Sequence, residues 1–592
     1  MSTATQSEKD SDAISYNANA PDTPRKPKLP LRWRIAILTL TCLASFGNHW
    51  SNGLIVYVSF RKAFESWFIL CRALKTTIIK ELHINNSQFA TLVACTNLVN
   101  TFLCIGIGFC IDKWGGPLLA VIMASFHLGG SIVMAGSATN NFNNYPVLIV
   151  GKVIAAIGDG SLDNAQHRIF STYFARGGGF AFSIGAIWGI ANLAQFTGQS
   201  TANIIATNLG TYAWALWISA IIALFSVICA VLVYFLDKWL VVNYQVTDHT
   251  DGSAMKSHTR RGVFSLKAVK ELPVTFWIVV LFSIFENAGV QSFVSISTQF
   301  AQQRLKKGAV IGGWVSSFYL LLPACLTPVL GLVIDLYGGR VSFLLVSALM
   351  FLISMLLLKF SHSVPAFVAA YVFYAFAQCV TPAPQVEIIR SIIADPQWFA
   401  TAFAIKKSVV QASIVIITTA AGKLQDDTPH ASLDPAVTLW LIYAFLCTAI
   451  AGALWIVANW FPNVLPAARL AEVKPKALDD EVTKLLRFKL EQKRLQDPQG
   501  TRIGGAPMDD SKIEEVIGGA DSESDDDSTD EEKKLLANEK LLKRVEPGIV
   551  TDRLRWVFLA ASAGIIAIGW IMFGLGVEWG VHGSVIAGTT GE

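Results

Sequence analysis

The chain has 592 residues, of which 53% are hydrophobic and 15% charged, and its formal net charge is +4. Soluble proteins carry roughly a quarter of charged residues, so this composition excludes an ordinary soluble protein and indicates that much of the chain lies in lipid. The net charge is small and changes sign from region to region, so we expect the lipid bilayer, and no nucleic acid, as a partner.

The sequence predicts an all-α polytopic membrane protein. A run of about 20 apolar residues crosses the hydrocarbon core as a helix, and twelve such runs form the predicted core. They lie at about 35–57, 88–111, 117–137, 145–166, 179–200, 212–236, 273–296, 309–333, 341–360, 363–386, 399–420 and 436–461. A thirteenth run lies at about 555–577, after a long charged segment.

These runs divide the chain into six segments. We expect a disordered cytosolic tail, a six-helix half, a cytosolic loop, a second six-helix half, a charged and disordered cytosolic tail, and an additional transmembrane helix. In that order they cover residues 1–34, 35–236, 237–272, 273–461, 462–553 and 554–578. We expect no cleavable signal peptide, because the first apolar run begins only near Trp33.

Lys and Arg are concentrated before the first run and between the sixth and seventh runs. Cytosolic loops carry an excess of these residues, so both segments are predicted to face the cytosol. The loop between the first two runs then faces away from the cytosol, and it holds the single Asn-x-Ser/Thr sequon of the chain, Asn85-Asn86-Ser87. This placement predicts glycosylation at Asn85.

Residues 58–72 interrupt that loop with charged side chains, in a stretch too short and too charged to cross the membrane. We interpret this segment as a retained intron, because Val58-Ser59 can be encoded by GTAAGT and the segment can end in a pyrimidine-rich tract followed by AG. Sequencing of the spliced transcript decides the question.

Two stretches of the second tail have the form Glu-x-x-x-Leu-Leu, which is typical of acidic dileucine signals for the lysosome or vacuole. They consist of Glu481 with Leu485 and Leu486, and of Glu531 with Leu535 and Leu536. If they act as signals, we expect sorting adaptors as their partners. Such short patterns also arise by chance, so a solvated tail without a signal is the alternative.

Two loops carry the same string, GFCIDKWGG at 108–116 after the second run and GLVIDLYGGR at 331–340 after the eighth. The first glycine permits close helix packing, the aspartate can accept bonds from a neighbouring helix N-terminus, and Gly-Gly supplies a tight turn.

The pair resembles the cytoplasmic G-x-x-x-D-R/K-x-G motif of the major facilitator superfamily. The matching residues are Gly108, Asp112, Lys113, Gly115, Gly331, Asp335, Gly338 and Arg340. The resemblance implies the major facilitator fold, with two parallel repeats around a midplane cavity and a gate latch that does not touch substrate.

Other segments resemble the lysosomal dipeptide transporter branch of that superfamily. They are FGNHWSNG, INNSQF and GKVIAAIGDGSLDNAQHRIFSTYFARGGGFAFSIG. The resemblance covers nearly all of residues 35–461 and implies export of dipeptides or amino acids from a lysosome or vacuole, with an accessory glycoprotein as a partner. In that branch a glutamate of the fourth span and an arginine of the fifth handle substrate charge. The glutamate aligns with Gly160, beside Asp159 and Asp163, and the fifth span of this chain has no charged residue.

Ionisable residues inside predicted spans are costly and tend to mark transport pathways. Those of this chain are His49, Lys152, Asp159, Asp163, Glu286, Lys406 and Lys407. We expect a zwitterionic solute to place its amine near Asp159, Asp163 or Glu286, and its carboxylate near Lys152 or Lys407. Burial favours the neutral form of a carboxyl group, so Glu286 is also a candidate proton carrier. The structural alternatives are interhelical ion pairs and side chains that snorkel outward.

We therefore predict secondary active or facilitative transport of a small polar organic solute by alternating access. The pattern GxxxxGK[ST] is missing, which leaves an ion gradient or the solute gradient as the driving force. An enzyme is not expected, because HExxH, GxSxG and paired histidine boxes are also missing, and no Cys spacing predicts a metal or cofactor. The alternative is a transceptor or scaffold that keeps the fold and signals through its acidic tail.

Overall fold

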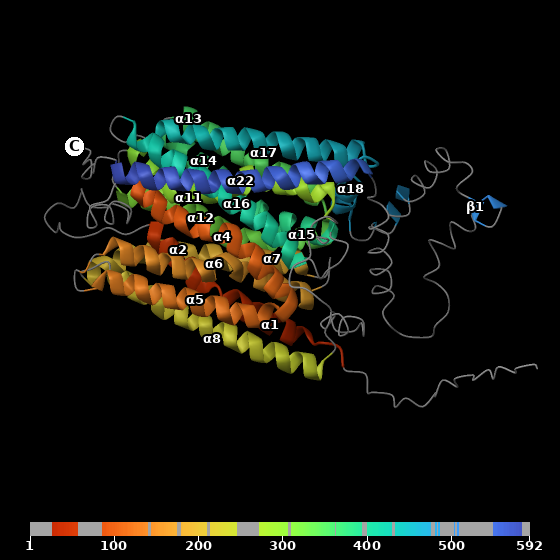
Figure 1. Ribbon diagram of the computed structural model, residues 1–592, viewed down its shortest axis with the longest axis horizontal. Coiled ribbons are helices and arrows are strands. Elements are labelled where there is room, and N and C mark those ends of the chain that lie inside the picture. The colour runs from red at the N-terminus through yellow and green to blue at the C-terminus, as the bar shows by residue number, and fades with distance from the viewer. Residues whose placement is uncertain are drawn as a thin grey trace, which may run out of the picture.

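The structure, a computed structural model, describes residues 27–56, 86–139, 142, 144–174, 179–209, 213–244, 272–305, 309–361, 363–392, 399–428, 433–474, 477, 480–481, 484–485, 502–503, 506–507 and 549–582. Within these residues the protein is a bundle of long helices that run side by side (Figure 1). The predicted all-α polytopic fold is confirmed. A two-residue antiparallel strand pair, β1 (Arg502–Ile503) with β2 (Ala506–Pro507), is the described exception.

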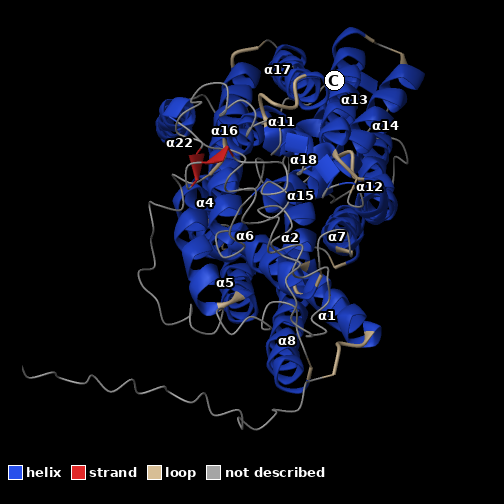
Figure 2. Ribbon diagram, turned by 90° about the vertical axis from the view of Figure 1, so that its right-hand side faces the viewer, coloured by secondary structure: helices blue, strands red, loops and turns tan. Residues whose placement is uncertain are grey.

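The helices fall into two groups of similar size. The N-terminal half consists of α1 (Leu31–Leu43), α2 (Phe46–Val56), α4 (Asn86–Trp114), α5 (Gly116–Ser137), α6 (Tyr145–Tyr173), α7 (Phe180–Asn208) and α8 (Ala213–Asn243). The C-terminal half consists of α11 (Val274–Leu305), α12 (Ala309–Tyr337), α13 (Arg340–Phe360), α14 (Val364–Val380), α15 (Pro382–Ile392), α16 (Phe399–Asp426), α17 (Asp434–Trp460) and α18 (Pro466–Glu472). Seen end-on in Figure 2, the two groups meet along the middle of the bundle, where α4 packs on α16 and α7 packs on α12.

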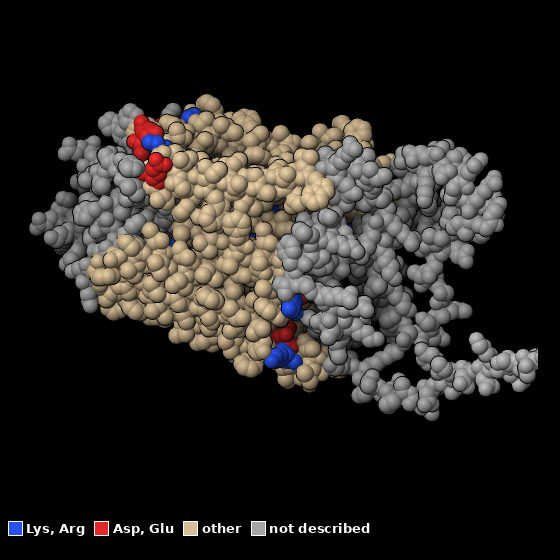
Figure 3. Space-filling view, in the orientation of Figure 1, with Lys and Arg blue, Asp and Glu red and all other residues tan. Residues whose placement is uncertain are grey.

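The flank of the bundle has the surface of a membrane protein. On the face shown in Figure 3, charged side chains of the described residues lie toward the two ends, and a wide band between them is almost free of charge. Large apolar side chains are exposed along the membrane-length helix α8, among them Ile221, Phe225 and Ile228. Exposed apolar area of this extent is stable in hydrocarbon and not in water.

The first predicted span is broken into α1 and α2, whereas the sequence predicted one continuous run. The hydroxyl group of Ser226, from α8, lies at the break: it accepts a hydrogen bond from Gly47 N at 2.8 Å and donates one to the Leu43 carbonyl at 3.2 Å. Backbone groups freed inside a membrane need such partners. A Cβ atom on Gly47 would lie 2.7 Å from the Cα atom of Ala223, so glycine is needed where α2 meets α8.

The tenth predicted span is divided as well. Helix α14 ends at Val380 and α15 begins at Pro382. A proline has no backbone N–H and cannot continue the hydrogen-bond ladder, so the chain bends at Thr381. The bend is central to the site described below.

Eleven helices of the described residues are long and apolar enough to cross a membrane, against thirteen predicted spans. The first predicted span falls short because its two pieces are short. The fourth, α6, falls short because it carries Lys152, Asp159, Asp163 and Arg168. Both still pack inside the bundle as helices.

The segment after the twelfth span is ordered at its start, although the sequence predicted a disordered tail from residue 462. Helix α18 packs on α13, α15 and α17. The Glu472 carboxylate accepts hydrogen bonds from Val341 N at 2.8 Å and Ser342 N at 3.0 Å, so it caps the first turn of α13.

The thirteenth predicted span is α22 (Ile549–His582), which lies parallel to the core helices (Figure 1) and packs on α4 and α16. The indole N–H of Trp570 donates to Thr101 Oγ1 at 3.0 Å. A Cβ atom on Gly569 would lie 3.2 Å from the Cβ atom of Ala412. Because Thr101 belongs to α4 and Ala412 to α16, this helix contacts both halves along one seam.

Two neighbouring glycines of α5 provide a test of the packing. A Cβ atom on Gly130 would lie 2.2 Å from Ala155 N and 2.6 Å from the Gly151 carbonyl oxygen on α6, whereas a Cβ atom on Gly129 would meet nothing within 4 Å. We expect Gly130→Ala to destabilise the protein by about 1–3 kcal/mol through overpacking. The matched control Gly129→Ala should be neutral or stabilise by up to about 1 kcal/mol. Thermal unfolding of the two purified variants in detergent checks this, and equal melting temperatures would contradict the α5–α6 contact.

Candidate functional site

A cavity of about 310 Å³ lies between the two halves, and helices of both halves form its wall. The wall is rich in polar side chains, which can bind a polar solute inside an apolar bundle. Its ionisable residues are His49, Lys152, Asp159, Asp163, Lys406 and Lys407. Its carboxamide residues are Asn48, Asn52, Asn97, Asn100, Asn192, Gln195, Asn287, Gln291, Gln378 and Gln411. Of the seven ionisable residues that the sequence places inside predicted spans, all but Glu286 therefore line one cavity.

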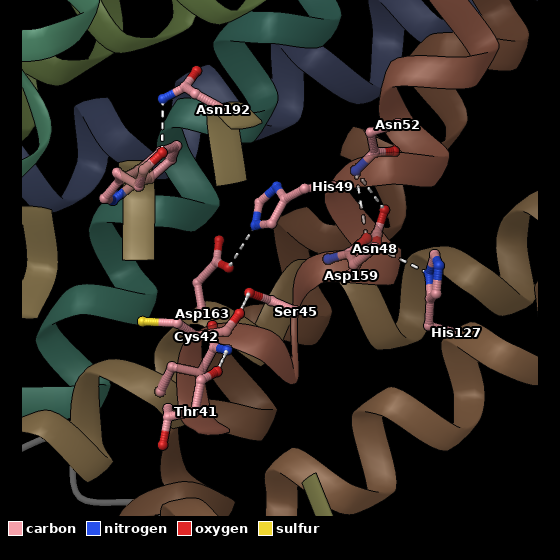
Figure 4. A network of polar contacts seen from close by, with 12 residues as sticks. Thr41, Cys42, Ser45, Asn48, His49, Asn52, His127, Asp159, Asp163 and Asn192 are labelled. Carbon is pink, nitrogen blue, oxygen red and sulfur yellow. Dashed lines mark hydrogen bonds and ion pairs between the residues drawn. The ribbon is translucent and has the colours of Figure 1, made fainter. Parts of the chain in front are cut away.

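Asp159 of α6 is held by side chains from two other helices of the N-terminal half. His127 Nδ1 lies 3.1 Å from Asp159 Oδ1, and Asn52 Nδ2 donates to Asp159 Oδ2 at 3.3 Å. Figure 4 shows both contacts, with Asn48 one turn before Asn52 on α2. The oxygen of the Asn52 carboxamide accepts a bond from the Lys152 ammonium group at 3.4 Å. The Asp159 carboxylate thus already has polar partners within its own half.

Asp163, one turn further along α6, joins the two halves. Its Oδ2 atom accepts a bond from Lys407 Nζ of α16 at 2.8 Å, and its Oδ1 atom lies 3.9 Å from His49 Nε2 (Figure 4). Both side chains of the ion pair are only about one-sixth exposed, 16% for Asp163 and 15% for Lys407. A charge at that depth needs a partner, so this pair neutralises two of the charges of the cavity.

Glu286 of α11 lies behind the wall of the cavity and is fully buried. Its carboxyl group accepts bonds from Ser347 Oγ at 2.9 Å, from the Thr381 hydroxyl group and from Gln385 Nε2 at 3.3 Å. Among the described residues no Lys, Arg or His lies within 4.0 Å of it. Thr381 and Gln385 flank the break between α14 and α15, so this break places neutral donors around a buried carboxyl group.

Gln385 also connects Glu286 to the cavity. Its carboxamide oxygen accepts bonds from the Lys406 ammonium group and from Asn287 Nδ2, the latter at 3.1 Å. Lys406 lines the cavity and is 4% exposed. The Lys406 ammonium group therefore reaches the Glu286 carboxyl group through one carboxamide.

The position aligned with the glutamate of the dipeptide transporter branch has no room for a side chain. A Cβ atom on Gly160 would lie 1.8 Å from Asn100 Oδ1. The Asn100 carboxamide, from α4, occupies the space that a glutamate would need. The charges of this cavity are therefore arranged differently from those that the resemblance implied.

At one end of the bundle, which we call the motif end, the repeated strings at 108–116 and 331–340 connect the two halves. Asp112 Oδ2 of α4 accepts bonds from Thr401 N at 3.0 Å and Thr401 Oγ1 at 2.6 Å, in the first turn of α16. Asp335 of α12 accepts bonds from Ala181 N at 3.2 Å and Phe182 N at 2.8 Å, in the first turn of α7. Each aspartate thus caps a helix of the opposite half, whose first N–H groups have no partner within their own helix.

A basic residue makes the complementary contact. Arg390, near the end of α15, donates from Nη2 to the carbonyl oxygens of Ser171 at 3.2 Å and Phe174 at 3.0 Å, where α6 ends. Its guanidinium carbon lies 3.9 Å from the ring centre of Phe180. A cation at a helix C-terminus is favourable, so three helix ends are capped across the seam between the halves at the motif end.

The other residues of the repeated strings lie within their own halves. Gly115, Gly338 and Gly339 have φ values of +89°, +70° and +68°, so the Gly-Gly turns use backbone conformations that other residues rarely adopt. Arg340 is fully buried, and its Nη2 atom lies 3.1 Å from Glu387 Oε1. Lys113 is exposed and lies over the ring of Trp114.

The family model of the Major Facilitator Superfamily matches residues 63–312 and 289–577. The chain belongs to the major facilitator superfamily. The resemblance drawn from the repeated strings is thereby confirmed, and the protein is a multi-pass membrane protein of a transporter family.

Within the superfamily, the chain is similar to proteins named lysosomal dipeptide transporter MFSD1. The Danio rerio protein is 23% identical over 460 residues, which cover 75% of this chain and 92% of the relative. The Mus musculus protein is 21% identical over 418 residues, which cover 68% of this chain and 82% of the relative. Among solved structures, that of the proton:xylose symporter XylE superposes with a TM-score of 0.54 at 14% identity, over 72% of this chain and 95% of that chain. This last likeness supports the fold alone.

The predicted modification and sorting residues lie mostly outside the described residues. This holds for Asn85, Leu486 and the whole second dileucine stretch, as it does for residues 58–72. In the first stretch, Glu481 Oε1 accepts a bond from Arg469 Nε at 2.9 Å, and Leu485 is buried. Adaptor binding at this stretch would require its release from these contacts.

Several site residues of this superfamily member were not predicted. A search for ionisable residues inside apolar runs could have found His127, which stands in the third predicted span. No local signal distinguishes Asn52, Gln385 or Thr401 from other polar residues of helices, because their roles depend on partners about 20 to about 300 residues away.

Removal of one carboxylate charge tests the closure of the motif end. We expect Asp112→Asn, and separately Asp335→Asn, to weaken two charge-assisted hydrogen bonds that are each worth about 1.5–3 kcal/mol. A loss of this size shifts the population toward an open motif end by at least about tenfold. Distances between spin labels on the ends of α4 and α16 measure the shift. Asp427→Asn, which removes a charge paired with Lys423 on the surface, is the control, and an unchanged distance distribution in both test variants would refute the latch.

Proposed function

We propose that this protein transports dipeptides across a lysosomal or vacuolar membrane, toward the cytosol, by alternating access. The observation that carries the proposal is the polar cavity that both halves share while contacts between the halves close its motif end. A solute that touches both halves is exposed to one side or the other when the halves rock, as in superfamily members with midplane sites. The similarity to relatives named lysosomal dipeptide transporters supports the choice of solute and membrane.

The chemistry of the wall suits a peptide. A peptide backbone offers one N–H and one C=O group for each amide, and both need partners when they leave water. The ten carboxamide side chains of the wall supply donors and acceptors, and the ionisable residues supply charge for the peptide termini. No covalent step is needed, because the peptide crosses unchanged.

Glu286 is the proton site in this proposal. It is fully buried and held by hydroxyl and carboxamide donors, with no cation in direct contact among the described residues. Such a carboxyl group can exist with or without its proton, since either state keeps hydrogen-bond partners. The Gln385 carboxamide connects it to Lys406 at the cavity wall, so that solute binding and proton binding can influence one another.

Orientation and sorting follow from the sequence. The charge rule places the motif end in the cytosol, and the stretches at Glu481 and Glu531 are the proposed signals for the lysosome or vacuole. An accessory glycoprotein and sorting adaptors are the proposed partners of the folded protein.

Flux measurements test the proposal. Purified full-length protein in vesicles should take up labelled dipeptides, and an inward proton gradient should accelerate the uptake. In Glu286→Gln the gradient should have no effect, because the amide cannot bind the proton, while melting temperature and gradient-free uptake should stay near those of the wild type. Glu578→Gln, an exposed change near the end of α22, is the matched control.

Each failure has a distinct meaning. An unchanged gradient effect in Glu286→Gln would refute the proton site. Protein that folds and yet moves no dipeptide would refute transport of peptides and favour the transceptor or scaffold alternative.

A further inference from the structure

The cavity wall holds one lysine in each half that is separated from an acidic side chain by a single carboxamide. In the N-terminal half, Lys152 donates to the Asn52 carboxamide at 3.4 Å, and the same carboxamide donates to Asp159 at 3.3 Å. In the C-terminal half, Lys406 donates to the Gln385 carboxamide, which donates to Glu286 at 3.3 Å. Each ammonium group is thus separated from a carboxyl group by one carboxamide.

Neither ammonium group has a carboxylate within 4.0 Å among the described residues. Both lysines are more than nine-tenths buried, with exposed fractions of 6% for Lys152 and 4% for Lys406, and both line the cavity. A buried cation is costly unless an anion compensates it. Lys407 shows the contrast, because Asp163 lies 2.8 Å from its ammonium group.

Both aspartates of the wall already have partners within the protein. Asp163 is paired with Lys407, and Asp159 is engaged by His127 and Asn52. The wall therefore holds three lysines and two aspartates in the described part of the chain, and neither Lys152 nor Lys406 is in direct contact with a carboxylate there.

The same wall offers acceptors for the neutral part of a solute. The carboxamide oxygens of Asn100, Gln378 and Gln411 are buried and have no hydrogen-bond partner among the residues that the structure describes. Such oxygens can accept bonds from a peptide N–H or from an amine. The free-energy cost of burying these unpaired oxygens is offset when a solute donates a hydrogen bond to them.

We propose that the cavity selects solutes with two carboxylates, acidic dipeptides above all, and binds one carboxylate on Lys152 and the other on Lys406. Asn52 and Gln385 act as positioning residues, because each carboxamide keeps a lysine ammonium group from forming a direct ion pair with the adjacent carboxyl group. Because one lysine belongs to each half, a solute with two carboxylates bridges the halves, whereas a solute with one engages a single half. The inference rests on the proposed transport of peptides through this cavity, and it departs from the zwitterion expected from the sequence.

Competition between matched ligands tests this selection. Ala-Glu, Ala-Gln and Ala-Lys are close in size and differ in side-chain charge, and glutarate carries two carboxylates without a peptide bond. The readouts are uptake into vesicles and the ligand-induced rise in melting temperature of purified full-length protein, which reports binding even without flux. We expect Ala-Glu to bind at least about tenfold more tightly than Ala-Gln, a difference of about 1.4 kcal/mol, with Ala-Lys weaker still.

Two variants assign the preference to the lysines. In Lys152→Gln, and separately in Lys406→Gln, the ratio of Ala-Glu to Ala-Gln affinity should fall to near one. The ratio is measured within one variant, so it does not depend on how much of that variant folds. Lys423→Gln, at an exposed lysine paired with Asp427, is the matched control and should keep the wild-type ratio.

The outcomes separate this inference from the proposed function. Equal affinity for Ala-Glu and Ala-Gln, a preference for Ala-Lys, or a ratio that survives both lysine changes would overturn the selection of two carboxylates while leaving peptide transport intact. Binding of glutarate that depends on Lys152 and Lys406, with no binding of any dipeptide, would support the two-carboxylate site and refute the peptide as its solute. Protein that folds and binds none of the four ligands refutes both.

Discussion

Asp112 and Asp335 each reach from one half of the bundle to the first turn of a helix in the other half. A helix N-terminus exposes N–H groups without partners and carries partial positive charge. Here Gly179, the residue before α7, supplies no side-chain cap, so Asp335 provides from outside what the helix lacks. The caps form only while the halves lie together at the motif end. Water can replace them at the membrane surface, so the caps can break and form again, as the proposed alternating access requires.

Deeper in the bundle, the charges are arranged by direct pairing and by spacing through carboxamides. One ion pair, Asp163 with Lys407, crosses the seam in the cavity. The other lysines are kept one carboxamide away from their acids, at Asn52 and Gln385. In a direct ion pair the two charges neutralise each other before any solute binds. A lysine spaced from its acid by a carboxamide has no direct anionic partner, so the carboxylate of a solute can pair with it. The halves are thus linked to each other at the motif end and by the ion pair of Asp163 with Lys407 at the cavity, and in our proposal a bound solute links them there as well.

Sequence reasoning found the repeat, the helices and most charged residues of the cavity, because apolar runs and intramembrane charges are local signals. It could not place features that depend on distant partners. The break between α1 and α2 is stabilised by Ser226, which is about 180 residues away in sequence. Glu286 was expected at the substrate and lies behind the wall, because the bend at Thr381 brings Gln385 between it and Lys406. The contact of α22 with both halves likewise depends on tertiary packing at Gly569 and Trp570.

A reversible cross-link at the motif end tests the central claim most directly. Asp112→Cys combined with Thr401→Cys, in a background without other cysteines, places two thiols where a hydrogen bond of 2.6 Å from Thr401 Oγ1 to Asp112 Oδ2 now joins the halves. The account predicts that oxidation stops dipeptide flux while ligand binding persists, and that a reductant restores flux to the level of the same protein before oxidation. Undiminished flux through fully cross-linked protein would contradict the account, because the two halves would then not need to separate at this end.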